Sequence, residues 1–318
     1  MIKSLKLDIT NQCNEACKFC PYHGIGGEIS EEGKRIVEIS RISLQDIQRI
    51  IDELDEYSLE KVKISGSGEA TLHHEFVKII DFLKERELFI KLITNGTTLY
   101  RNVETMSNID DLVISIHGNE TTHNNIVQHR KAYQLIIKGL NKMKNFDNEA
   151  LQKISFTYVI TGYNLNEIKD IIELSKNFNI PVNFYFDFTP EKHKKVDTTH
   201  LLEKIEHIRK EGFTIYPNLK NDEIIKFFSQ PNYIINQFYC DHINNEIDIK
   251  ANGDVSICRS NVWGNIYKDN LSNIINSNTR KTFIDTIESE IQSGGLGNRC
   301  NRCCYQNSHV PYNKQYGK

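Results

Sequence analysis

The sequence predicts an α/β fold, a partial (β/α)6 barrel of strand–helix units followed by a smaller cysteine-rich module. Two observations predict it. Short runs with the composition of buried strands alternate with segments of helical periodicity, as a parallel sheet with outer helices requires. The eight cysteines of the 318 residues form one tight group near the start and another in the last quarter. Six units are too few for a closed eight-stranded barrel, so we expect functional side chains at the carboxyl ends of an open one.

Composition favours a globular protein with a locally recognised ligand. Hydrophobic residues make up 39% and charged residues 25% of the chain, enough to bury a full core. A net charge of −3 without a long basic run predicts no nucleic acid and no membrane as partner. No apolar run approaches about 18 residues, and the start reads as a strand, so we expect a cytoplasmic protein. Thiols stay reduced there, which favours metal over disulfides.

The strand–helix units follow one another along the first part of the chain. The predicted strands cover residues 4–10, 61–65, 89–94, 111–116, 153–160 and 181–187. Apolar residues at helical spacing fill the gaps, most clearly Ile47, Ile50, Ile51 and Leu54, then Phe76, Ile79, Ile80 and Leu83. Ser43 with Asp46 resembles a capping box that opens the first of these helices, and Asn164 with Glu167 resembles another at the fifth.

The chain changes character after Asp187, where it becomes charged and mostly helical ("TPEKHKKVDTTHLLEKIEHIRKEG"). We therefore predict a barrel in residues 1–190, a helical connector in 191–234 and the second module in 235–318.

Three cysteines, Cys13, Cys17 and Cys20, stand directly after the first predicted strand, separated by three and then two residues. A structural zinc site needs four ligands, so three thiolates on a short loop leave one position open. An iron–sulfur cube held by three cysteines likewise leaves one iron free to bind a ligand. Zinc completed by a distant fourth ligand is the alternative to a cluster.

The spacing C-x3-C-x2-C at this place resembles the cluster loop of the radical SAM enzymes, and the chain resembles that family along most of its length. The resemblance implies a TIM-like partial barrel with a [4Fe-4S] cluster on the three cysteines. It further implies that the free iron binds S-adenosylmethionine (SAM), which one electron cleaves to methionine and a 5'-deoxyadenosyl radical. That radical abstracts hydrogen from an unactivated carbon, while the protein positions the target. An external one-electron donor such as flavodoxin or ferredoxin is then expected.

Further positions match the SAM contacts of the family. Phe19 matches the aromatic position near the adenine, although it is also explained by packing on the barrel. In "SGSGEATLHHEF", Ser67, Gly68 and Glu69 resemble the Gly-Gly-Glu turn that contacts the SAM amino group, with Glu69 as acceptor for an ammonium. This turn departs from the family in Ser67 for the first glycine and in Ala70 where proline is common. An ordinary strand-to-helix turn is the alternative.

Three more candidates follow later strands. Asn95 in "LITNG" is placed to reach the ribose, although Asn-Gly is also a frequent structural turn. Ser115 in "VISIHG" stands at the family's polar position for SAM. Arg130 in "NNIVQHRKAY" resembles the arginine that pairs with the methionine carboxylate, and a solvated helix arginine is the alternative. We expect His117 to be a loop histidine rather than a catalyst.

The second module begins with "EIDIKANGDVSICRSNVWGNI", which predicts two short strands joined at Asn252-Gly253. In isolation, its two separated cysteines and one C-x2-C pair would favour a zinc ribbon. Coupled to the barrel, the arrangement C-x12-G-x4-C, then "GNI", a helix and C-x2-C resembles the twitch domain, the shortened form of the SPASM domain. This resemblance implies one auxiliary [4Fe-4S] cluster fully ligated by Cys240, Cys258, Cys300 and Cys303.

Cys304 is left over beside Cys303. A packed free thiol or substitute ligand is one interpretation, and a thiol that donates hydrogen is the other. Abstraction from one face and donation from the other inverts a stereocentre, which is epimerisation. Without a donor, the auxiliary cluster could accept the second electron and complete a dehydrogenation.

The substrate is predicted less sharply. The cluster loop begins at residue 13, which leaves no N-terminal domain of the kind that grips leader peptides and favours a small natural product. The layout, with "CPY" and "CNRCCYQN", is most like the twitch enzymes that oxidise or epimerise aminocyclitols and aminoglycosides. The alternatives are epimerisation or crosslinking of a ribosomal peptide, methyl transfer, an iron–sulfur electron carrier and a zinc-binding non-enzymatic module. On the sixth strand, either Tyr185 and Asp187 or Phe184 and Phe186 face the interior.

Overall fold

The computed structural model describes residues 2–23, 38–187, 195–230, 233, 242–257 and 261–293. Their strands form one ten-stranded sheet in the order β10-β9-β8-β1-β2-β3-β4-β5-β6-β7. From β1 to β7 neighbouring strands pair in parallel, as the alternation of strands and helices predicts. These strands are β1 (Ser4–Leu7), β2 (Lys61–Ile64), β3 (Phe89–Thr94), β4 (Asp111–Ser115), β5 (Ile154–Ile160), β6 (Val182–Phe186) and β7 (Thr214–Tyr216).

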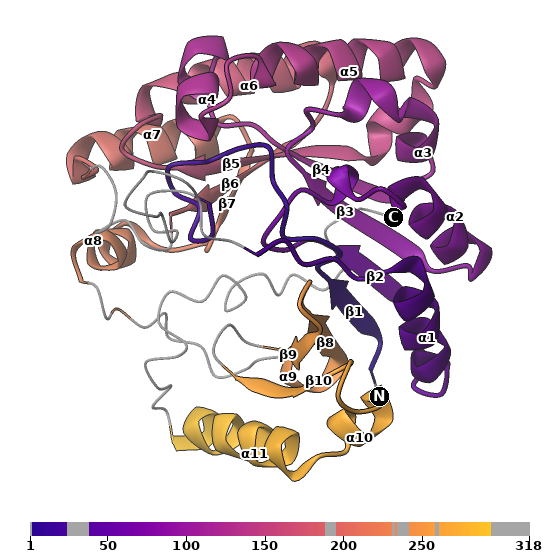
Figure 1. Ribbon diagram of the computed structural model, residues 1–318. Coiled ribbons are helices and arrows are strands. Elements are labelled where there is room, and N and C mark those ends of the chain that lie inside the picture. Colours follow the sequence, from indigo (N-terminus) through magenta and orange to yellow (C-terminus); the bar gives the residue numbers. More distant parts are fainter. Residues whose placement is uncertain are drawn as a thin grey trace.

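Helices follow the outer side of the parallel strands (Figure 1). They are α1 (Leu44–Asp55), α2 (Phe76–Glu85), α3 (Val103–Ser107), α4 (Glu120–Val127), α5 (Ala132–Phe146), α6 (Ile168–Phe178), α7 (Thr198–Lys210) and α8 (Asn221–Ser229). The apolar residues that predict α1 and α2 are the ones these helices bury against the sheet. Ser43 caps α1 as expected, because its hydroxyl accepts a hydrogen bond from the Asp46 N–H (3.1 Å). No helix of the described residues is long and apolar enough to cross a membrane.

The second predicted cap is wrong. Asn164 precedes a short 3₁₀ helix, Leu165–Glu167, and α6 starts only at Ile168. The Asn164 side chain does not cap either helix, because it is used elsewhere: its oxygen accepts from the Thr161 N–H (2.9 Å) and its amide donates to the His117 carbonyl (3.1 Å). A buried loop crosslink therefore replaces the cap.

The sixth strand shows which side chains face the outer helices and which face the barrel interior. Phe184 and Phe186 are fully buried, and Phe186 contacts the α8 rings of Phe227 and Phe228 with centroids 5.6 and 5.4 Å away. Tyr185 therefore points to the inner face of the sheet, where its ring stacks on that of Tyr216 of β7 with centroids 5.2 Å apart. By alternation, Asp187 lies on the same inner face. The same alternation places Lys6 of β1, Lys63 of β2 and Lys91 of β3 opposite the buried aliphatic face, so these strands give the barrel interior a polar lining.

The carboxyl-terminal part of the chain continues the same sheet (Figure 1). Its elements are α9 (His242–Asn245), β8 (Glu246–Ile249), β9 (Asp254–Ser256), β10 (Val262–Asn265), α10 (Leu271–Ile275) and α11 (Asn278–Ser293). β8 pairs in parallel with β1, and β9 turns back on β8. The hairpin turn contains Gly253 with φ +86°, a left-handed conformation that glycine accepts, as the Asn252-Gly253 pair predicts.

The sheet runs across the domain boundaries that the sequence predicts. β7 lies within residues 191–234, predicted as a helical connector, and it adds a strand beside β6. β7 has only three residues, too few for a clear alternating pattern, so the sequence did not indicate it. The three-part division stays a prediction.

Candidate active site

The cysteine loop crosses the carboxyl end of the barrel and is held by helix α4. The Ala16 N–H donates to the Val127 carbonyl (3.0 Å) and the Lys18 N–H donates to the Ile126 carbonyl (2.9 Å). These carbonyls lie in the last turn of α4, where a helix has no internal donors for them. The loop amides therefore satisfy the helix end, and the helix end fixes the loop.

The three thiols lie half-buried on this loop. Burial raises the pKa of Cys13 to about 12, and burial followed by nearby negative charge raises the pKa of Cys17 well above its ordinary value. The Cys17 thiol lies within electrostatic range of Cys13 and Cys20, so the three form one group. Such thiols ionise when a metal supplies compensating positive charge.

The arrangement fits an iron–sulfur cube. In a cube each cysteine binds a different iron, so three grouped thiols on one loop can hold three of its four irons and leave the fourth free. A structural zinc site would need a fourth protein ligand on the same ion.

Glu15 stands between the first two cysteines, and the sequence reasoning missed it. Its side chain is buried, and its Oε2 accepts a hydrogen bond from the Cys17 thiol (3.5 Å). Burial, and then the negative charge of Glu69, raise the pKa of Glu15 to about 8. The available signal in the sequence was an acidic residue between two cysteines of the triad, because its side chain must lie close to their thiols.

The glycine turn after β2 packs directly on the cysteine loop. A Cβ at Gly68 would lie 2.3 Å from the Thr10 carbonyl oxygen and 2.5 Å from that of Gln12. The Glu69 N–H donates to the same Gln12 carbonyl at 2.8 Å. The turn and the loop thus approach backbone to backbone, which only glycine permits. The structure brings together the two motifs that the sequence placed far apart.

Ser67 is anchored by a residue that the sequence reasoning did not single out. Its N–H and its hydroxyl both donate to Oδ2 of Asp8, at 2.8 and 2.6 Å. Asp8 follows β1 and is buried, and burial raises its pKa. The serine that replaces a family glycine therefore has a structural partner, a carboxylate one strand away.

Glu69 is buried and joins the ends of β2 and β3. Its Oε1 accepts from the Thr71 N–H (3.2 Å), the Thr71 hydroxyl (2.6 Å) and the Thr94 hydroxyl (2.7 Å). Its Oε2 accepts from the Asn95 N–H (2.7 Å). One carboxylate oxygen is thus saturated, while Oε2 keeps capacity for one more donor. The expected contact with an ammonium stays a prediction, directed to Oε2.

Asn95 connects β3 to the cysteine loop. Its Nδ2 donates to Asn14 (2.8 Å), and its Oδ1 accepts from the Thr97 N–H and hydroxyl (3.0 and 2.7 Å). The Asn14 amide donates in turn to the Thr97 hydroxyl (2.9 Å). This closed triangle holds Asn95 beside the loop; its contact with a ribose stays a prediction.

Ser115 and Arg130 are less constrained. Ser115 ends β4 half-buried, and its hydroxyl makes no hydrogen bond within the described part of the chain. Arg130 is exposed between α4 and α5, and only its carbonyl is bound, by the Asn124 amide (3.0 Å). Its guanidinium forms no ion pair within the described ranges. Both remain candidates for SAM contacts.

Phe19 rests on a pair of buried histidines. Its ring meets that of His117 edge-to-face at 4.8 Å. The His117 N–H donates to Nδ1 of His123 (3.0 Å), and the Val159 N–H donates to Nδ1 of His117 (3.3 Å). Burial lowers the pKa of His117 well below its ordinary value and that of His123 to about 3, so both rings are neutral at pH 7. His117 lies in the loop after β4, as expected, where it is buried and supports Phe19.

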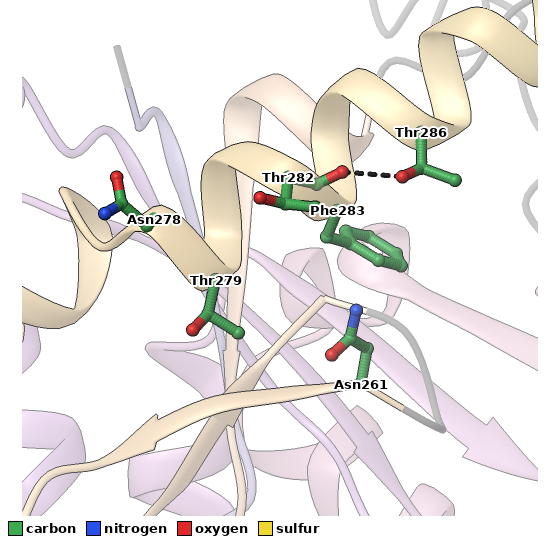
Figure 2. Close-up of a pocket in the computed structure, with 6 residues that line it drawn as sticks. All are labelled: Asn261, Asn278, Thr279, Thr282, Phe283 and Thr286. Atoms are coloured by element: carbon green, nitrogen blue, oxygen red, sulfur yellow. Dashed lines mark hydrogen bonds between the residues drawn. The ribbon is translucent and has the colours of Figure 1, made fainter.

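The predicted auxiliary ligands Cys240, Cys258, Cys300 and Cys303 lie outside the described residues, as does Cys304. Figure 2 shows the residues that line a hollow between α11 and the start of β10, and the volume of this hollow is about 470 Å³. Thr279, Thr282 and Thr286 line one side of it and Asn261 the other. The Thr286 hydroxyl donates to the Thr282 carbonyl within α11 (2.7 Å).

A parallel partial barrel with three grouped thiols at the carboxyl end of its first strand defines a class of cluster-bearing barrel proteins. The Radical SAM superfamily model matches residues 7–175, more than half of the chain. The protein therefore belongs to the radical SAM superfamily. The SPASM iron–sulfur cluster-binding domain matches residues 240–304, which confirms the predicted SPASM-like module. Together the two matches imply SAM and two [4Fe-4S] clusters as cofactors.

Curated relatives resemble the barrel. The chain is 29% identical to GTP 3',8-cyclase of Synechocystis sp. over 187 residues, 58% of this chain and 53% of the relative. It is 25% identical to the mycofactocin maturase MftC of Mycolicibacterium smegmatis over 177 residues, 55% of this chain and 42% of the relative. The chain thus spans about half the length of these relatives.

Solved structures share the fold over most of the chain. Streptococcus suis SuiB bound to its precursor peptide SuiA covers 89% of this chain and 66% of its own, with 16% identity and a TM-score of 0.65. BtrN in complex with AdoMet and 2-DOIA covers 94% of this chain and 92% of its own, with 13% identity and a TM-score of 0.53. At these identities the likeness shows the fold alone.

Proposed function

We propose that the protein oxidises or epimerises a small aminocyclitol-like or aminoglycoside-like substrate in natural-product biosynthesis. One observation carries the proposal: the cysteine loop and the Ser67-Gly68-Glu69 turn are joined at the carboxyl end of a barrel with a polar interior. A cluster on Cys13, Cys17 and Cys20, with SAM bound, would supply reductive SAM cleavage and hydrogen abstraction from an unactivated C–H bond.

The chain's own residues position the reactants. In this proposal Glu69 Oε2, Ser67 and Gly68 would contact the SAM amino group, and Asn95, Ser115 and Arg130 are the other candidate contacts. Phe19 is placed to pack on the adenine, supported by His117. On the inner face of the sheet, Tyr185 stacked on Tyr216 offers an aromatic wall suited to a ring with polar substituents. Radical chemistry needs such fixed placement, because a misplaced carbon is not attacked.

The second module and the partners complete the proposal. Cys240, Cys258, Cys300 and Cys303 would hold the auxiliary cluster, and Cys304 would donate hydrogen if the outcome is inversion. The two outcomes differ only in the step after hydrogen abstraction. For inversion, Cys304 would give a hydrogen atom to the substrate radical and become a thiyl radical, which one electron from the auxiliary cluster and one proton from solvent would return to the thiol. For dehydrogenation, the substrate radical would lose one electron to the auxiliary cluster and one proton to solvent. An external one-electron donor such as flavodoxin or ferredoxin would reduce the catalytic cluster, and we expect this in the cytoplasm.

Modification of a ribosomal peptide is the second candidate function. It is supported by the fold shared with peptide-bound SuiB and by the partial similarity to mycofactocin maturase. A peptide would enter the same barrel, so the substrate offered decides between the two.

The test is an anaerobic reaction of reconstituted, reduced protein with SAM in D2O, offered aminocyclitols, aminoglycosides and short peptides. One solvent deuterium in the product means epimerisation, and a product lighter by two hydrogens means dehydrogenation. SAM cleavage without any product from these compounds would contradict both substrate classes.

Two cysteine variants assign the clusters in the same assay. Cys13→Ala should reduce 5'-deoxyadenosine to background, whereas retained production would reject the catalytic triad. Cys258→Ala should lose about four irons per chain, because its cluster holds four. Full iron content in Cys258→Ala would reject the auxiliary cluster.

A further inference from the structure

Polar atoms without partners gather on the inner face of the sheet around β1. Oδ1 of Asp248, Oγ of Ser65 and Oγ of Ser256 are buried and make no hydrogen bond within the described part of the chain. Oδ1 of Asp8 also accepts none there, since both Ser67 bonds go to Oδ2. Buried polar atoms rarely stay unsatisfied, so such a group indicates a missing partner.

Strand register places these side chains on adjoining strands. Lys6 of β1 is paired with Asp248 of β8, and Asp248 is paired with Ser256 of β9. Asp8 follows Lys6 on the same face, and its N–H donates to the Ile249 carbonyl (2.9 Å). On the other side, the Ser65 N–H extends β2 beside β1 through the Leu7 carbonyl (3.1 Å). Adjacent strands lie about 4.8 Å apart, so Ser65 lies beside Asp8 and Ser256 beside Asp248, while Ser65 and Ser256 are about 14 Å from each other.

The charges of the patch formed by Asp8, Asp248 and Ser65 are largely matched. The Lys6 ammonium binds Oδ2 of Asp248 at 2.6 Å and lies within electrostatic range of Asp8, and Lys250 lies within range of Asp248. Burial raises the pKa of Asp8, while the Ser67 hydrogen bonds and the Lys6 ammonium lower it. What the patch leaves open is hydrogen-bond acceptors, Oδ1 of Asp8 and Oδ1 of Asp248.

The chemistry of the patch suits an organic ammonium. A primary ammonium has three donors, and the patch offers two carboxylate oxygens and a hydroxyl oxygen as acceptors. We infer that Asp8 Oδ1 and Asp248 Oδ1, with Ser65, form a subsite for an amino group of the substrate.

This inference rests on the proposed function and refines it. Asp8 is tied to Ser67 of the SAM turn, so an ammonium at Asp8 would lie beside the place where hydrogen is abstracted. SAM carries an ammonium of its own, and the same chemistry could serve that group instead. The experiment must therefore measure SAM and substrate separately.

The probes are streptamine, a diamine on the scyllo-inositol ring, and scyllo-inositol itself, which has hydroxyls in place of both amines. Calorimetric titration uses reconstituted protein under anaerobic conditions with SAM saturating, and SAM affinity is titrated separately. Asp8→Asn removes the charge and keeps an acceptor for Ser67. Asp52→Asn makes the same charge change on the outer helix α1, where Asp52 pairs with Arg86, and serves as control.

Streptamine binding should weaken about 10- to 100-fold in Asp8→Asn, the range for losing a charged hydrogen bond, while scyllo-inositol and SAM binding change less than about twofold. The control should match the wild type. Unchanged streptamine binding would overturn the subsite. Weakened SAM binding with unchanged streptamine binding would assign the carboxylate to SAM. Equal weakening of streptamine and scyllo-inositol binding would make Asp8 a positioning residue.

Ser65→Ala provides a second variant if Asp8→Asn fails to fold. It removes a hydroxyl that makes no hydrogen bond among the described residues, so it should fold normally and weaken streptamine binding several-fold. A wild-type protein that binds neither probe overturns the subsite for aminocyclitols. Formation of 5'-deoxyadenosine, measured independently, still decides whether the proposed SAM chemistry stands.

Discussion

Individual buried side chains set the geometry around the cysteine loop. His117 and His123 each accept a backbone N–H at Nδ1, which fixes both rings as the Nε2–H tautomer when neutral. Asn164 locks the carbonyl of His117 from the opposite side. The Val159 N–H thus holds the His117 ring at Nδ1, while His123 and Asn164 hold the backbone of His117.

The buried histidines should make stability depend on pH. The His123 pKa falls to about 3 in the folded chain from about 6.5 unfolded, so protons bind the unfolded state preferentially below pH 6.5. Between pH 7 and 5.5 this lowers the free energy of unfolding by about 1 kcal/mol for His123 alone. Measured by urea denaturation, the free energy of unfolding of His123→Asn should fall between pH 7 and 5.5 by about 1 kcal/mol less than that of the wild type. His74→Asn, which changes an exposed histidine, should show the same pH dependence as the wild type. Equal pH dependence in all three would mean that His123 titrates in solvent.

At the scale of elements, the ends of β2 and β3 and the cysteine loop form one hydrogen-bonded unit. Glu69 binds Thr71, Thr94 and Asn95, and Asn95 continues the connection to Asn14 of the loop. Glu69, Thr71, Thr94 and Asn95 are buried, so their mutual satisfaction is required for folding as well as for placing the candidate SAM contacts, while Asn14 on the loop is exposed.

Glu69→Gln should destabilise this unit. The amide nitrogen that replaces one oxygen cannot accept from the Asn95 N–H or the threonine hydroxyls, and the charge that strengthens these bonds is lost. We expect a loss of about 2–4 kcal/mol in the free energy of unfolding, together with weaker SAM binding. Glu85→Gln on the exposed face of α2 is the matched control. A difference below about 0.5 kcal/mol between the variants would contradict the role of Glu69.

At the scale of the whole molecule, the carboxyl-terminal part is built into the barrel sheet. β8 pairs with β1 along four residues, and the Lys6–Asp248 ion pair crosses the junction. Helix α1 adds to it, because Arg49 donates to the Ile266 carbonyl (3.1 Å) and Glu53 accepts from the Leu271 N–H (2.6 Å). These contacts should couple the two parts energetically.

The coupling can be measured with the single tryptophan of the chain, Trp263, which is buried in β10. Its fluorescence reports on the carboxyl-terminal part, and far-ultraviolet circular dichroism reports mainly on the barrel helices. The two signals should change at the same denaturant concentration, because shared strands unfold together. Two separate midpoints would show that the parts unfold independently.

Much of the fold was accessible from the sequence, because long periodic segments determine it. All six predicted strands exist, and the residues predicted to face the core in α1 and α2 do so. β7 was missed because three residues carry no periodicity, and the orientation of β6 could not be chosen because Tyr185 and Phe184 are both aromatic. Only the α8 rings decide it.

The candidate site was accessible in part. Motif spacing identified the cysteine loop and the glycine turn, which the structure joins through Gly68. Asp8, Glu15 and the histidine pair were missed because their importance lies in burial and in partners far away in sequence. The Asp8 to Ser67 contact spans 59 residues, and no local pattern announces it.

The pairing of β1 with β8 also bears on how the chain is made. Lys6 and Asp248 are separated by 242 residues, so β1 leaves the ribosome long before its second neighbour exists. At typical elongation rates of about 5–20 residues per second, that interval lasts about 12 to 48 seconds. Throughout it, one edge of the sheet presents unpaired backbone groups, the usual template for aggregation. The newborn barrel therefore depends on its last strands, or on a chaperone, to cover the edge of its first.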